Sequence, residues 1–100
     1  MDLSHANLTN ADLSHAILYN VDLSHVILRK VILTDSTLYD VNLSGADLSG
    51  ADLSHVILYD VNVSGADLSG ADLSHVILYN VTLDDITLRN AKINLTTGNN

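Results

Sequence analysis

Leucine recurs at every fifth position along almost the whole chain. Nineteen positions fall on this series between residues 3 and 93, and seventeen hold Leu, the others being Val63 and Ile93. A second apolar series lies two residues earlier, with Ala or Val at sixteen of its nineteen positions. The residue between the two is mostly Asp, Asn, Ile or Thr. Each unit therefore has the local alternation of a short strand, with both apolar side chains on one side.

A period of five fits neither a straight helix nor a straight strand. Five residues advance about 500° around an α-helix, and they carry successive Leu to opposite faces of a strand. The apolar positions stay on one side only if the chain turns a corner in every unit, and four corners complete a coil of twenty residues. The four Tyr recur at this spacing, as Tyr19, Tyr39, Tyr59 and Tyr79, and residues 41–60 and 61–80 differ at only two positions.

Units such as residues 11–15 (Ala-Asp-Leu-Ser-His) and 46–50 (Ala-Asp-Leu-Ser-Gly) resemble the A(D/N)LXX motif of pentapeptide repeat proteins. The resemblance covers residues 1–95, and it implies an all-β, right-handed quadrilateral parallel β-helix with Leu at the inward centre of each side. We expect a single solenoid domain of about five coils over residues 1–95. No helical segment is recognisable, so we expect no capping helix, and residues 96–100 form a polar C-terminal tail.

Composition and charge exclude several classes of protein. Hydrophobic residues make up 47% of the chain, which is too many for a disordered protein. Twelve Asp against four Lys and Arg give a net charge of −8, which argues against direct binding of nucleic acid or an anionic membrane. No apolar run approaches the length of a membrane span and no signal peptide is recognisable, so we expect a cytoplasmic location. The absence of Cys excludes disulfides and thiolate metal sites.

The outward positions on the fourth side of each coil are unlike those on the other sides. They form a column of Ile with one Thr beside a column of Tyr, and residues of these kinds are typical interface anchors. We predict an interaction surface, called here the Tyr/Ile wall. Its residues are Ile17, Tyr19, Tyr39, Ile57, Tyr59, Ile77 and Tyr79, with Thr37 in the Ile column. The alternative is a ladder of stacked side chains that only supports the packing of the coils.

Histidines fall into two further columns at the predicted corners. One column holds His15, Asp35, His55 and His75, and the other holds His5 and His25. A metal ion could bridge His55 and His75 with Asp72, because imidazole and carboxylate groups suit Zn²⁺. We favour the interpretation that these are corner residues copied with the repeat, and we expect no metal site, no cofactor and no catalytic residue.

Aspartates are expected to lie above one another on neighbouring coils. The predicted pairs are Asp2 with Asp22, Asp47 with Asp67, and Asp52 with Asp72. Because two like charges at close range disfavour ionisation, stacking of this kind predicts that some of the carboxyl pKa values are raised.

Three hypotheses for function remain open. The first is a non-catalytic scaffold that binds a protein partner of unknown identity, or that forms a homo-oligomer through uncapped ends or through the Tyr/Ile wall. The second follows from the resemblance, because some pentapeptide repeat proteins are acidic rods that mimic DNA and bind type II topoisomerases. The third is an engineered or consensus-like repeat without a natural function, which the near identity of residues 41–60 and 61–80 suggests.

Overall fold

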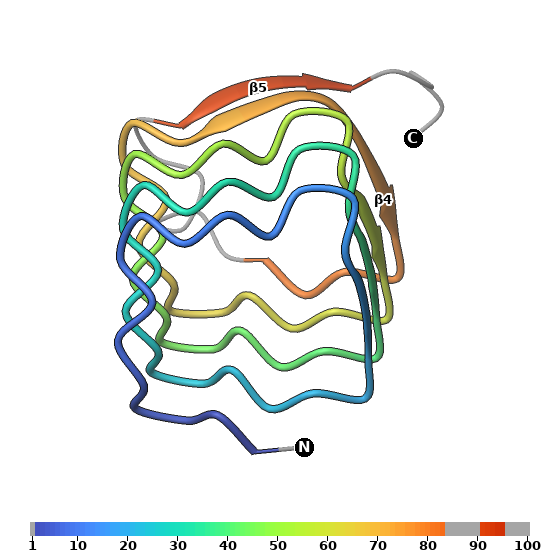
Figure 1. The fold of residues 1–100 in the computed structure, drawn as a ribbon. Coiled ribbons are helices and arrows are strands. Elements are labelled where there is room, and N and C mark those ends of the chain that lie inside the picture. Colours follow the sequence, from blue (N-terminus) through green and yellow to red (C-terminus); the bar gives the residue numbers. More distant parts are fainter. Residues whose placement is uncertain (1, 84–90, 96–100) are drawn as a thin grey trace.

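The computed structural model describes residues 2–83 and 91–95, and within these residues it contains strands and turns but no helix. Five strands form one sheet in the order β1-β2-β3-β4-β5, and every neighbouring pair is parallel. The strands are β1 (Ile17–Tyr19), β2 (Thr37–Tyr39), β3 (Ile57–Tyr59), β4 (Asp72–Tyr79) and β5 (Lys92–Leu95). Successive coils lie directly above one another (Figure 1).

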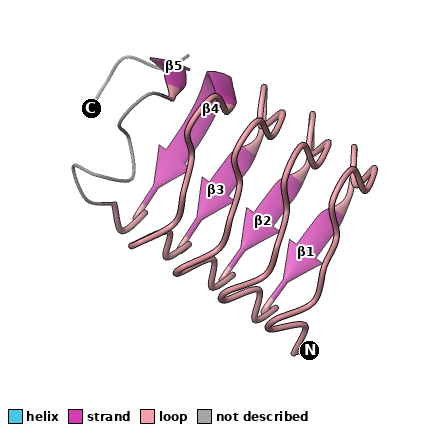
Figure 2. Ribbon diagram, turned by 90° about the vertical axis from the view of Figure 1, so that its left-hand side faces the viewer, coloured by secondary structure: helices cyan, strands magenta, loops and turns pink. Residues whose placement is uncertain are grey.

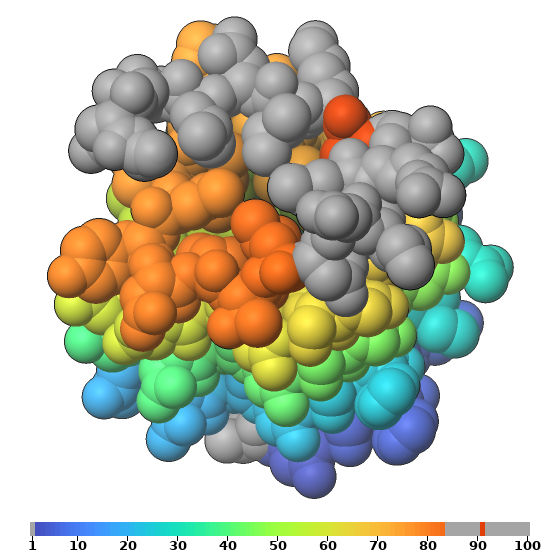
Figure 3. Space-filling view, turned by 180° about the vertical axis from the view of Figure 1, so that it is seen from behind, coloured from blue at the N-terminus to red at the C-terminus, as the bar shows by residue number. Residues whose placement is uncertain are grey.

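The register of the pairing confirms the predicted coil of twenty residues. Leu18 pairs with Leu38, Leu38 with Leu58, and isolated bridges on the other sides also join each residue to the one twenty positions later. Strands β1 to β4 therefore lie in parallel along one side of the molecule (Figure 2). From the back, the surface forms bands that follow the chain from one coil to the next (Figure 3). The fold class is the predicted parallel β-helix; the predicted fifth coil includes residues 84–90, which lie outside the described residues.

The corners explain which residues the fifth position of the unit accepts. At the first corner the Ala6 amide donates to the Leu3 carbonyl, and His5 has a φ of 69°. A turn of this kind needs a left-handed residue at its third position, which Gly, Asn, Asp and His adopt most readily. The fifth residue has a positive φ in every unit from His5 to Asn80, and Lys30 is the exception in residue type. The sequence preference at this position is therefore a preference for backbone conformation.

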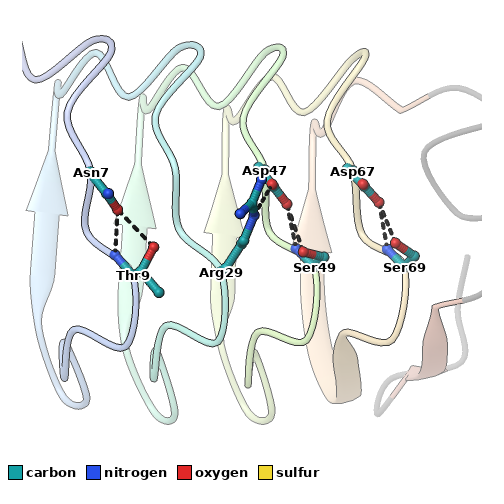
Figure 4. A network of polar contacts seen from close by, with 7 residues as sticks. All are labelled: Asn7, Thr9, Arg29, Asp47, Ser49, Asp67 and Ser69. Atoms are coloured by element: carbon teal, nitrogen blue, oxygen red, sulfur yellow. Dashed lines mark hydrogen bonds and ion pairs between the residues drawn. The ribbon is translucent and has the colours of Figure 1, made fainter.

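Short polar contacts fix the approach to many corners. The Asp52 Oδ1 atom accepts hydrogen bonds from the Ser54 amide at 3.1 Å and from the Ser54 hydroxyl at 2.7 Å. The same arrangement joins Asp67 to Ser69 and Asn7 to Thr9 (Figure 4). Asp and Asn characteristically bond to the backbone two residues ahead, which stabilises a turn there. These bonds give the Asp-Leu-Ser pattern of the sequence its physical reason.

The core is a stack of Leu side chains surrounded by Val and Ala. Side chains such as Leu28, Leu38 and Leu48 have no exposed surface, while Leu3 at the N-terminal coil is 37% exposed. Ser36 replaces an apolar residue in the core, and its hydroxyl donates to the Leu33 carbonyl at 2.6 Å. Because that bond satisfies the buried hydroxyl, the substitution does not interrupt the core.

Some expectations from the sequence fall at the edge of the described chain. The predicted tail at residues 96–100 lies outside the described residues, and the domain boundary at residue 95 stays a prediction. Across residues 2–83 and 91–95, we find no helix long and apolar enough to cross a lipid bilayer.

Candidate functional site

The four Tyr rings form a continuous ladder on the outer surface of β1 to β4. Neighbouring ring centroids lie 5.2, 4.6 and 4.5 Å apart from Tyr19 to Tyr79, and the last two pairs are stacked with interplanar angles of 6°. This spacing follows from the parallel register, which sets equivalent residues of adjacent coils about 4.8 Å apart. The first pair is tilted by 41°. The structure therefore brings together the Tyr column that the sequence predicts.

The column beside the Tyr ladder exposes three Ile side chains, with Thr37 between the first two. Ile17 is 78% exposed, and Ile57 and Ile77 are 37% and 36% exposed. Residues in a strand alternate between its two faces, so the Leu between each Ile and Tyr points into the core. Tyr19 and Tyr79 are also largely exposed at 66% and 59%. All seven predicted interaction residues thus lie on one surface, the Tyr/Ile wall.

The ladder changes the acid–base behaviour of the Tyr59 phenol. The adjacent Tyr79 phenol, together with loss of contact with water and the Tyr39 and Asp60 groups, raises the pKa of Tyr59 above its ordinary value of 10.0. A phenol with a raised pKa is neutral near pH 7. The Tyr59 ring can therefore contact apolar or cationic groups without adding negative charge.

A groove of about 590 Å³ borders the Tyr side of the wall, and the sequence analysis did not predict it. It is called here the acidic groove, and its lining residues are Asp2, Asn20, Val21, Asp22, Asp40, Val41, Asn42, Asp60 and Asn62. The lining comes from the corners directly after Tyr19, Tyr39 and Tyr59, and from the first outward position on the next side of the coil. A signal for it existed in the sequence, since Asp or Asn recurs at both positions over successive coils.

The prediction that stacked aspartates have raised pKa values is wrong for Asp2, Asp22, Asp47 and Asp52. Hydrogen bonds from the Ser24 hydroxyl and amide lower the pKa of Asp22, and they outweigh the opposing charge of Asp2 on the coil below. The same two kinds of bond from Ser4 lower the pKa of Asp2. The pKa of Asp12, which belongs to none of the predicted pairs, is lowered in the same way by Ser14. The hydrogen-bond donor two residues ahead therefore affects the pKa of each Asp more than the carboxylate on the neighbouring coil does.

Asp47 also has a basic partner that the sequence did not reveal. Partial burial alone would raise its pKa, but hydrogen bonds from Arg29 and Ser49 lower it overall. The Arg29 Nε atom donates to the Asp47 Oδ2 atom at 2.6 Å, and this contact joins adjacent coils (Figure 4). The charge of Arg29 is thus paired with a carboxylate on the next coil.

The predicted His columns exist as stacked rings. His5 and His25 have centroids 5.5 Å apart, and His55 and His75 have centroids 4.7 Å apart. His15 Nε2 lies 3.9 Å from an Asp35 oxygen. Within the described residues no group of three or more potential metal-ligating side chains comes together, and Asp72 is held by hydrogen bonds from Ser74. The arrangement therefore offers pairs of imidazoles and no complete ligand set.

Comparisons with known proteins match the repeat over nearly the whole chain. A family model described as pentapeptide repeats matches in eight copies, over residues 2–35, 36–74 and 57–94. No curated protein matches the chain.

Solved structures of pentapeptide repeat proteins resemble this one. The protein Rfr23 from the cyanobacterium Cyanothece 51142 is 32% identical, with a TM-score of 0.64, and the match covers 92% of this chain and 63% of that one. The protein alr5209 from Nostoc Pcc 7120 is 31% identical, with a TM-score of 0.63 and coverage of 95% and 80%. QnrB1, a plasmid-mediated fluoroquinolone resistance protein, is 24% identical with a TM-score of 0.48, and the match covers 92% of this chain and 52% of that one. The present chain thus spans about 63% of the length of Rfr23.

Proposed function

Because the chain belongs to the pentapeptide repeat family, we propose that it is a non-catalytic scaffold that binds another protein through the Tyr/Ile wall. One observation carries the proposal: an ordered sheet face of β1 to β4 exposes a column of three Ile, interrupted by Thr37, beside an unbroken column of four Tyr. Contiguous apolar surface on a monomer marks interaction sites more often than single exposed residues do. Aromatic residues also carry much of the binding energy at protein interfaces.

Stacking between the Tyr rings does not account for the whole wall. The ladder covers the ring faces, as the centroid distances of 4.5–5.2 Å show. The Ile column takes no part in that stacking, yet Ile17 is 78% exposed. Ile and Thr both suit a strand, so strand propensity does not explain why three of the four positions hold Ile and not the more polar residue found at Thr37. The repeated use of Ile therefore supports a contact surface.

The polar side chains support a scaffold rather than an enzyme. Acid–base chemistry needs titratable groups that converge on a substrate. Here the Asp carboxylates at the second position of the unit make the same local bond to Ser from coil to coil, as in Asp12 with Ser14 and Asp52 with Ser54. Groups that repeat in equivalent structural roles provide architecture.

Self-association is a second candidate, because an apolar wall can also pack against a second copy of the chain. Association through uncapped ends stays a prediction.

Binding to a type II topoisomerase as a DNA mimic also stays a prediction, supported by the charge of −8. An assay of gyrase supercoiling tests it, since no effect at micromolar protein would remove that alternative. A cytoplasmic location and an engineered origin likewise stay predictions.

The proposal is tested by site-specific crosslinking in the cells that express the protein. A photoreactive phenylalanine replaces Ile17 on the wall, and a matched variant carries it at Asn7, an exposed outward position on another side. We expect crosslinks to a defined protein from position 17 and none of that product from position 7. Crosslinks from both positions in equal yield, or from neither, would contradict an interface at the wall.

A further inference from the structure

The chemistry around the Tyr/Ile wall restricts what can cover it. The acidic groove runs along its Tyr edge, because Asn20, Asp40 and Asp60 directly follow the Tyr of their own coils. The second lining column comes from the outward positions at Asp22 and Asn42 on the next side of the coil. A partner that lies over the rings therefore also meets the groove.

The groove holds four carboxylates, and none of its lining residues is basic. Hydrogen bonds from the Ser24 hydroxyl and amide lower the pKa of Asp22, and equivalent bonds from Ser4 lower that of Asp2. These two groups consequently stay ionised well below neutral pH. Asp60 accepts a hydrogen bond from the Asn80 amide group, which holds that carboxylate in place along the corner.

The molecule already contains one Arg that binds an outward Asp carboxylate on a neighbouring coil. Arg29 occupies the same position in its unit that Tyr19 occupies on the wall side, and it reaches the carboxylate of Asp47 on the next coil at 2.6 Å. Arg side chains are also suited to an aromatic edge, because the planar guanidinium stacks on rings and binds carboxylates with two parallel bonds. The combination of Tyr rings and adjacent carboxylates therefore favours a guanidinium over other cations.

Resting on the function proposed above, we propose that the partner at the Tyr/Ile wall is a basic protein segment whose Arg side chains enter the acidic groove. A second copy of this chain does not fit that role. Each copy carries a net charge of −8, and a contact between two walls would bring two acidic grooves towards each other. The occupant is instead a protein of opposite charge, with apolar side chains facing the Ile column.

The test uses the full chain and a labelled deca-arginine peptide as the probe. Binding is followed by fluorescence anisotropy, with deca-lysine measured in parallel. The groove variant combines D22N, D40N and D60N. Asn is structurally suitable because it already occupies equivalent positions at Asn20 and Asn42. The matched control combines D12N, D52N and D67N on the other sides, so both variants change the net charge equally, from −8 to −5.

The groove variant is expected to bind deca-arginine at least about tenfold more weakly than the unmodified chain, and the control variant to stay within about threefold. Deca-lysine is expected to bind more weakly than deca-arginine, because an ammonium lacks the planar contact with the rings. Equal weakening in the two variants would show that only net charge attracts the peptide, and it would overturn the inference. Absence of binding to the unmodified chain, or equal affinity for the two peptides, would also overturn it.

The outcomes separate this inference from the function on which it rests. If position 17 gives crosslinks but the groove variant binds deca-arginine as tightly as the unmodified chain, the interface is supported and its basic partner is excluded. If position 17 gives no crosslinks, the interface itself is excluded, whatever the affinity for the peptide. Thermal unfolding of both triple variants checks that the coil is intact before binding is measured.

Discussion

The inner and outer faces of strands β1 to β4 are built on the same spacing of twenty residues but serve different ends. Inside, Leu38 is fully buried, and its neighbours in the column are its equivalents from adjacent coils. Outside, Ile17 and the Tyr ladder have the same register and remain in contact with water. The repeat therefore sets the register of side chains on both faces, but only the inner column is buried in the core. Order on the outer face is available for binding.

The largest effect is expected from truncating the inner column. Leu58→Ala should lower the free energy of unfolding by about 2–5 kcal/mol, because it leaves a cavity in a packed core. Ile57→Ala, one residue away on the outer face, should cost only about 1–2 kcal/mol, since its side chain is already 37% exposed and has less burial to lose. Urea unfolding measures both values. Equal losses of unfolding free energy would show that the two faces contribute equally to stability, contrary to this expectation.

A smaller effect is expected at the corners, which belong to neither face. Gly65 has a φ of 72°, and a Cβ there would meet nothing closer than 3.8 Å. Gly65→Ala should therefore cost about 1–2 kcal/mol through left-handed backbone strain alone. Gly65→Asn serves as the control and should cost less, because Asn adopts the same conformation at Asn10. If Ala and Asn are equally tolerated in thermal unfolding, the explanation of the fifth position fails.

The smallest effect is expected from the Asp–Ser bonds and appears only as a dependence on pH. The Ser54 hydroxyl is the main cause of the lowered pKa of Asp52 in the folded chain. A carboxyl whose folded pKa is depressed stabilises the protein above its ordinary value of 3.8, and this contribution is lost as pH falls through the folded pKa. The unfolding free energy should therefore fall less between neutral pH and about pH 3 in Ser54→Ala than in the unmodified chain.

Ser44→Ala is the matched control for that measurement. Ser44 donates its amide to the Asn42 Oδ1 atom at 2.9 Å, and an amide side chain does not titrate. The control should therefore leave the difference in unfolding free energy between the two pH values unchanged. The same pH dependence in both variants would show that the Asp52 bond does not contribute to it.

The sequence was sufficient for the features that depend on period. The five-residue spacing of Leu predicted a corner in every unit, and the recurrence of Tyr19 and Tyr39 predicted which residues pair between coils. Both predictions are confirmed because pairs from β1 to β4 join residues twenty positions apart; a shift lies between β4 and β5, where Val76 pairs with Leu95. The exposure of the Tyr/Ile wall followed from the alternation of side chains along a strand.

Features that depend on side-chain direction could not be predicted in the same way. Stacking of Asp2 and Asp22 suggested repulsion, but the nearer hydrogen bonds from Ser24 decide the pKa of Asp22. The bond from Arg29 to Asp47 requires a long side chain to cross to the next coil, which spacing does not reveal. The acidic groove depends on the shape of the corner after each Tyr as well as on the charges around it.

The central claim is that the outer wall serves binding and is dispensable for folding. The most direct measurement combines Tyr39→Ser and Tyr59→Ser in the chain that carries the crosslinker at position 17. The account predicts that the crosslinked product disappears, while the thermal midpoint falls by less than it does for Leu58→Ala. An undiminished crosslink, or a loss of stability as large as that of the core variant, would contradict it.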